Sequence, residues 1–142
     1  MMKDQMMKEI IQAMKEKNRV KKGVLQLVKS ALELAEKEKK APLTEEEEIR
    51  IVQREVKQTK DSLEEAEKYG RDDLIAEAKE RLEILANYLP QQLSEAEVKE
   101  QLVAAGITQG MNMGDAMKVA MATLAGKAEN KLISKVVKEL IA

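Results

Sequence analysis

A chain of 142 residues suits one domain or two small ones, and its 44% hydrophobic and 36% charged residues exclude intrinsic disorder. Cysteine and histidine are absent, which excludes disulfides, zinc sites of the usual Cys/His kind, and catalysis by Cys–His or Ser–His–Asp groups. No apolar run approaches the roughly 20 residues of a membrane span, and the N-terminus lacks the apolar centre of a signal peptide, so we expect a cytoplasmic protein without a membrane partner.

Residues 3–17 and about 19–40 predict the first two helices, because apolar side chains recur there at three-to-four spacing. Asn18, between the two segments, is expected to be the N-cap of the second helix. The first segment places five apolar side chains on one face: Met6, Met7, Ile10, Ile11 and Met14.

A long third helix is expected over residues 45–69. Thr44 and Glu47 form a capping box at its start, and Gly70 can end it. Another helix follows from Arg71, with an apolar stripe that reaches Leu89. The connection between these two helices is short, which predicts an antiparallel hairpin.

The stretch around Pro90 is the expected domain boundary. Pro90 disfavours helix at the residue before it, and a second capping box follows at Ser94 and Glu97. We therefore expect an all-α protein with a helical N-terminal domain over 1–90 and a small three-helix module over 91–142. The helices of the module are expected at about 95–105, 113–125 and 128–141. Asn112 is expected to cap the second of these, whose predicted buried stripe is Met113, Ala116, Met117, Ala120, Met121 and Leu124.

The net charge of −1 hides an uneven distribution of charge. Residues 1–43 carry eleven Lys or Arg against six Asp or Glu, residues 44–93 carry eight against fourteen, and residues 94–142 carry six against six. Residues 116–142 alone carry five against two, so the middle is acidic and both ends are basic. Such asymmetry can mark a nucleic-acid partner. The same pattern is also explained by attraction between the acidic middle and the basic parts of the chain.

The segment 124–138, LAGKAENKLISKVVK, spaces its four lysines by four, four and three residues. On a helix this spacing stacks the lysines along one face, opposite Ile133 and Val137. Two interpretations stay open: a solvated face that keeps the protein soluble, or a face that contacts phosphates. Gly126 would stand at a helix start, where free N–H groups favour phosphate, although Glu129 opposes this. With Lys118 added, the candidate nucleic-acid-binding residues are Lys118, Lys127, Lys131, Lys135 and Lys138.

Other charged and sulfur-containing groups are better explained by structure than by chemistry. Consecutive glutamates at 45–48 point in different directions on a helix, so they favour a solvated first turn over a metal site. Methionines 113, 117 and 121 are expected to fill the core rather than to line a binding groove. We therefore assign no catalytic residue, no metal site and no cofactor.

Four stretches occur in an order that resembles one family: GRDDL at 70–74, EILANYLPQQLSEAE at 83–97, MGDAM at 113–117 and GKAENK at 126–131. Together they resemble the YqeY family, the proteins with a GatB/YqeY domain, over nearly the whole chain. The resemblance implies a helical N-terminal part followed by a small helical module. The same architecture forms the tail of the GatB subunit of the glutamine-dependent tRNA amidotransferase, where the tail is associated with tRNA contact.

From the resemblance we expect a tRNA-associated binding module that meets phosphates through the lysines. One alternative is a component of glutamine-dependent amide transfer, a carbon–nitrogen ligase with glutamine as amido donor. Its catalytic parts would lie on a partner, because the chain has no Gly-rich phosphate loop and no Ser-Ser-Lys or cysteine-based signature. A second alternative is a protein–protein adaptor. The expected partners are tRNA and an amidotransferase-like or other protein, and the expected oligomeric state is a monomer.

Overall fold

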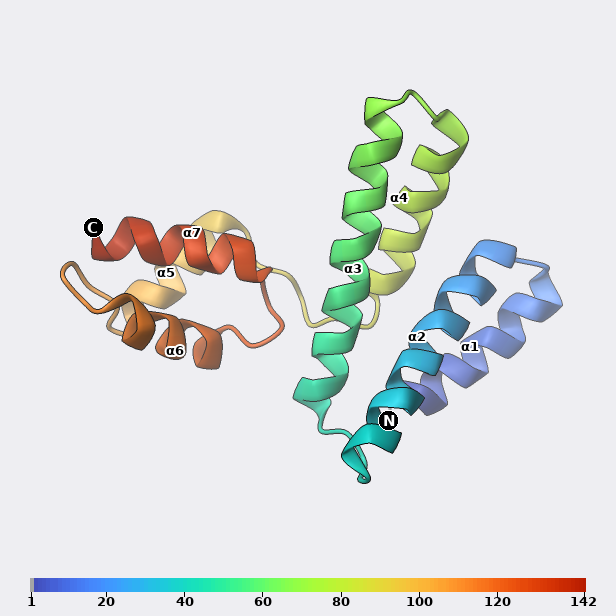
Figure 1. Ribbon diagram of the computed structural model, residues 1–142, viewed down its shortest axis with the longest axis horizontal. Helices are drawn as coiled ribbons and strands as arrows, with labels where there is room; N and C mark the ends of the chain where they lie inside the picture. The colour runs from blue at the N-terminus through green and yellow to red at the C-terminus, as the bar shows by residue number, and fades with distance from the viewer. Residues whose placement is uncertain (1) are drawn as a thin grey trace. The chain divides into compact units, whose positions relative to one another are not determined.

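The computed structural model describes residues 2–142, and all regular secondary structure in that range is helical. The predicted all-α class is confirmed. No helix among the described residues is long and apolar enough to cross a membrane. The helices, shown in Figure 1, are α1 (Met2–Glu16), α2 (Arg19–Lys39), α3 (Glu45–Lys68), α4 (Asp72–Ala86), α5 (Glu95–Ala104), α6 (Met113–Thr123) and α7 (Asn130–Ile141).

The chain divides into two compact units between Leu89 and Pro90. Helices α1 to α4 make up the first unit, and α5 to α7 make up the second. Each unit has its own cluster of buried apolar side chains.

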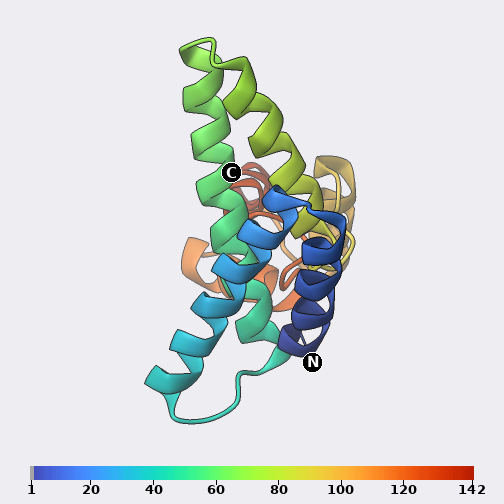
Figure 2. The same ribbon diagram turned by 90° about the vertical axis from the view of Figure 1, so that its right-hand side faces the viewer.

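The first unit consists of two helical hairpins, α1 with α2 and α3 with α4, which Figure 2 shows side by side. Helix α2 packs against both α3 and α4, whereas α1 packs mainly on α2. The core between them is aliphatic apart from Tyr88, and its buried members are Met6, Ile10, Val24, Leu25, Val28, Leu32, Leu43, Val52, Ile84, Leu85 and Tyr88.

The apolar face predicted for the first helix is only partly covered in the structure. Met6 and Ile10 are buried, but Met7, Ile11 and Met14 are 43%, 47% and 54% exposed. Because α1 packs mainly on α2, only the narrow stripe of side chains directed at that helix is covered.

The predicted N-caps of the first unit are present. The side chain of Asn18 accepts a hydrogen bond from the N–H of Lys21 at 3.1 Å. Thr44 and Glu47 form the reciprocal capping box at the start of α3. The ammonium of Lys39 and the N–H of Thr44 both donate to Glu47, and they lower the pKa of its carboxyl to about 2. Gly70, in the left-handed region at φ 65°, follows α3.

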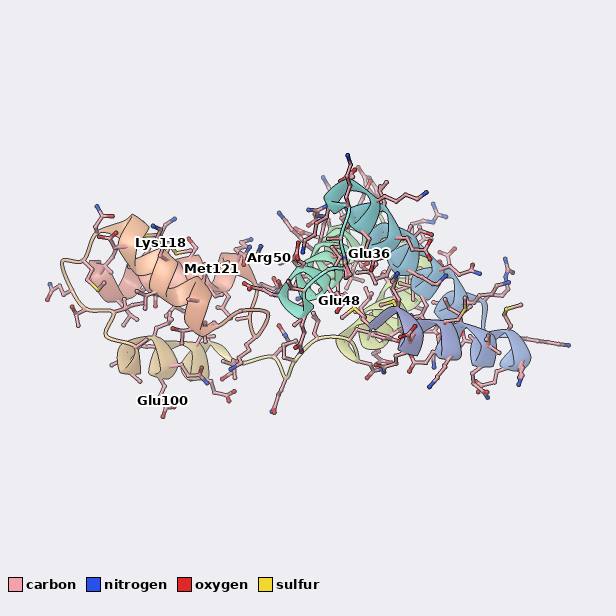
Figure 3. All side chains as sticks on the ribbon, turned by 90° about the horizontal axis from the view of Figure 1, so that it is seen from below. Glu36, Glu48, Arg50, Glu100, Lys118 and Met121 are labelled. Atoms are coloured by element: carbon pink, nitrogen blue, oxygen red, sulfur yellow. The ribbon has the colours of Figure 1, made fainter. Side chains whose placement is uncertain are left out.

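A carboxylate at the start of α3 lies inside the first unit. Glu48 is only 5% exposed, and burial raises the pKa of its carboxyl, with the negative charge of Glu36 acting in the same direction. The backbone N–H of Met2 donates a hydrogen bond to Glu48 and partly opposes this shift. Lys3 pairs with Glu36 at 2.7 Å, so Glu48 and Glu36 both hold the start of α1. Figure 3 labels the two glutamates.

The second unit is a three-helix module in which α7 packs on both α5 and α6. In α6 the small residues Ala116 and Ala120 are fully buried, together with Leu124 after the helix. Methionines 113, 117 and 121 are partly buried and pack against the same core, so the predicted stripe is fully buried at its alanines and partly buried at its methionines.

Candidate nucleic-acid interface

Helix α7 is amphipathic, and its buried side fixes the direction of its lysines. Ile133, Val136 and Val137 are at most 1% exposed and anchor the helix in the module. Lys131, Lys135 and Lys138 are exposed and follow one another by four and three residues. Such residues share one helix face, and at 1.5 Å rise per residue they span roughly 10 Å. The structure therefore brings three of the predicted lysines into one row.

Lys127 does not belong to that row, because α7 begins at Asn130 rather than near 128. Lys127 is exposed, but it lies in the turn before the helix, where Gly126 has a φ of 73°. Its carbonyl accepts a hydrogen bond from the N–H of Leu93 at 2.8 Å. The prediction of one continuous four-lysine helix face is thus wrong at its first member.

The helix start expected at Gly126 and Lys127 also lies further along the chain. The residue at the N-cap of α7 is Glu129, in an extended conformation, not Gly126 or Lys127. A carboxylate at this position places negative charge where an anion would have to bind. Glu129 therefore disfavours a bound anion at this helix start.

Lys135 forms an ion pair across two helices. Its Nζ lies 3.1 Å from Oε1 of Glu95, the first residue of α5, and the two side chains are 59% and 51% exposed. The hydrogen bond to Glu95 raises the pKa of the Lys135 ammonium, and the negative charges of Glu95 and Glu139 add to the effect. The row of lysines therefore includes a cation that a carboxylate of the same module already contacts.

Lys118 is exposed on α6 and lies on the side of that helix opposite the buried row of Ala116 and Ala120 (Figure 3). The five candidate lysines are all exposed, but they come from two helices and one turn of the module. We name the three that share one face of α7 the lysine surface: Lys131, Lys135 and Lys138.

Two features of this site were missed from the sequence. One is the ion pair of Glu95, which joins residues forty positions apart. The other is the attachment of the segment before α5 to the turn that carries Lys127, where the Nε2 of Gln92 donates to the carbonyl of Gly126 at 2.7 Å. Only the capping box at Ser94 could have signalled that Glu95 begins a helix, and it gives no information on what that residue faces.

Outside the lysine surface, the described residues contain no group of three or more acidic side chains arranged to hold a metal ion. A hollow of about 450 Å³ lies between α3 and α4 in the first unit. Its floor is made of small side chains, including Ala66 and Ala78. Charges of both signs line it, from Glu65 and Glu77 and from Arg71 and Arg81.

A family model described as Yqey-like protein matches residues 3–141. No curated protein sequence matches the chain.

Proposed function

The chain belongs to the family of Yqey-like proteins, and from this premise we propose that it is a tRNA-associated binding module whose lysine surface contacts RNA phosphates. The observation that carries the proposal is the row of Lys131, Lys135 and Lys138 opposite the buried side of α7. Because the apolar side is fixed in the core, the cations are held on a rigid element. Each phosphate that a lysine neutralises releases counterions and so favours binding.

The composition of the module indicates which part of the RNA it contacts. Tyr69 and Tyr88 are the aromatic residues of the chain, and both precede the module. A surface that binds single strands needs aromatic side chains on which bases stack. The lysine surface lacks them, which favours contact with the phosphates of a folded RNA over readout of its bases.

A salt titration of tRNA binding tests the proposal. The double variant Lys131→Glu, Lys135→Glu should bind tRNA more weakly than the original chain. The slope of log K against log salt should fall by roughly two units, since each lost phosphate contact removes about one. The matched control is Lys8→Glu, Lys15→Glu, which reverses two exposed lysines of α1 and changes the net charge equally.

The outcomes separate a local effect from a general effect of charge. Weakening confined to the α7 variant supports the proposal. Equal affinity and equal salt slope in the original chain and the α7 variant would refute the proposal and indicate that the lysines only keep the protein soluble. Equal weakening in both variants would also refute a localised surface. Circular dichroism checks that each variant is folded, as expected for substitutions of exposed residues.

The hollow between α3 and α4 supports a second candidate function, a protein–protein adaptor. Leu74, 41% exposed, and Tyr69, 67% exposed, stand at this hollow above a floor of small residues. An amphipathic helix fits such a groove, since its apolar side chains can enter between the two helices. A protein retained in a ribonuclease-treated pull-down by the original chain, but not by Ala66→Glu, would favour the adaptor. Loss of all partners on ribonuclease treatment would oppose it.

A further inference from the structure

Within the lysine surface, the ammonium of Lys135 already contacts the carboxylate of Glu95. We propose that Glu95 competes with RNA phosphate for Lys135 and so weakens the binding of RNA by the module. This inference rests on the proposed function, because it concerns the same surface. The geometry that carries it is the 3.1 Å approach of the two charged groups, both of them half-exposed and accessible to an incoming anion.

The position of Glu95 is set by the packing of α5. Glu95, Val98 and Leu102 recur at steps of three and four, so they share one helix face. Val98 and Leu102 are fully buried, and α5 packs on α7. The face of α5 that carries Glu95 is therefore the face directed into the module, which brings the carboxylate to Lys135 on α7.

The charge of Glu95 is also favoured where it lies. Ser94 is the N-cap of α5, and its hydroxyl accepts from the N–H of Glu97 in the second capping box. Glu95 is the first residue of the helix, where the positive end of the helix dipole stabilises a carboxylate. The carboxylate of Glu95 thus lies beside Lys135 before any RNA arrives.

A phosphate that binds Lys135 must displace this carboxylate or accept its repulsion. Exposed ion pairs contribute little to stability, so the pair opens readily but still weakens binding. The measured energies of such pairs correspond to a change in affinity of about 1.5- to 5-fold. When RNA displaces Glu95 from Lys135, the ammonium exchanges one anionic contact for another, and fewer counterions are released. The binding of RNA should therefore depend less steeply on salt when the ion pair is present than when it is absent.

The test compares Glu95→Gln with Glu100→Gln. Both residues are exposed carboxylates of α5, and both substitutions remove one negative charge. Figure 3 shows Glu100 on the outer side of α5, pointing away from α6. Neither change touches the capping pair Ser94 and Glu97. Glu100→Gln therefore controls for the change in net charge.

We expect Glu95→Gln to bind tRNA about 1.5- to 5-fold more tightly than Glu100→Gln, with a salt slope steeper by up to about one unit. In a Lys135→Gln background the two variants should bind equally, because the competitor has lost its target. In solution, Glu95→Gln should lower the pKa of the Lys135 ammonium, which an NMR titration of that side chain measures directly.

The failures of this inference and of the proposed function are distinguishable. If Lys131→Glu, Lys135→Glu weakens binding while Glu95→Gln binds no better than Glu100→Gln, only the competitor role is overturned. A pKa of Lys135 that does not respond to Glu95→Gln would likewise overturn it, since the pair would not form in solution. If reversing the lysines changes nothing, the proposed function fails, and the competitor role fails with it.

Discussion

The backbone N–H of Leu93 donates to the carbonyl of Lys127, thirty-four residues further along the chain, at 2.8 Å. Beside it, the side chain of Gln92 donates to the carbonyls of both Pro90 and Gly126. The segment that leads into α5 is thereby fastened to the turn that leads into α7. This attachment holds Lys127 in its turn, although the residue lies outside any helix.

The attachment predicts the effect of Gln92→Ala. The variant loses the side-chain hydrogen bonds to the carbonyls of Pro90 and Gly126. The free energy of unfolding should therefore fall by about 0.5–1.5 kcal/mol. Exchange of the Leu93 N–H with solvent should become faster, because its acceptor turn is less restrained. Amide exchange followed by NMR measures this. Unchanged exchange at Leu93 would show that the backbone bond alone holds the turn.

Replacing Gly23 or Gly106 by alanine should change the stability of the chain in opposite directions. Gly23 lies inside α2, and a Cβ there meets no atom within 4 Å, so Gly23→Ala should stabilise the chain by about 0.5–1 kcal/mol. Gly106 ends α5 with a φ of 94°, so Gly106→Ala should cost roughly 1–2 kcal/mol. Urea unfolding measures both. A stabilising Gly106→Ala would contradict the left-handed turn at that position.

The buried carboxyl of Glu48 predicts a pH-dependent gain on replacement. Its pKa is raised in the folded chain, so its stabilising contribution is present below the unfolded pKa and is lost as pH rises through the folded pKa. Glu48→Gln carries no charge at any pH. It should therefore be more stable than the original chain near pH 7, and the gain should vanish below about pH 4.

Urea unfolding between pH 4 and pH 7 measures this gain. The matched control is Glu64→Gln, which removes the same charge from an exposed position of the same helix. A difference between Glu48→Gln and the original chain that stayed constant across the range would contradict a raised pKa at Glu48.

The purified chain should hydrolyse neither glutamine nor ATP. Histidine and cysteine are absent from the sequence, which also has no Gly-rich phosphate loop. Ammonia release and phosphate release after extensive purification measure the two activities. Turnover that persisted through purification and disappeared on a single substitution would overturn the assignment of no catalytic residue.

The sequence by itself determined the helices and most of their ends. The capping boxes at Thr44 and Ser94 and the N-caps Asn18 and Asn112 are all present, because each involves contacts within three residues. The three-to-four periodicity of apolar residues identified the helical class for the same reason. The exposure of the five lysines was expected from the same pattern, and the structure agrees with it.

The tertiary structure alone decided what each helix face meets. The spacing of Lys127 from Lys131 fits a helix, but the hydrogen bonds of Gln92 and Leu93 hold Lys127 in a turn, and Glu129 becomes the N-cap of α7. The periodicity of a single helix does not encode that Glu95 reaches Lys135, since this depends on how α5 packs on α7. Capping contacts depend on residues that are neighbours in the sequence, so they can be predicted from it. Contacts between helices depend on the joint packing of side chains that are distant in the sequence.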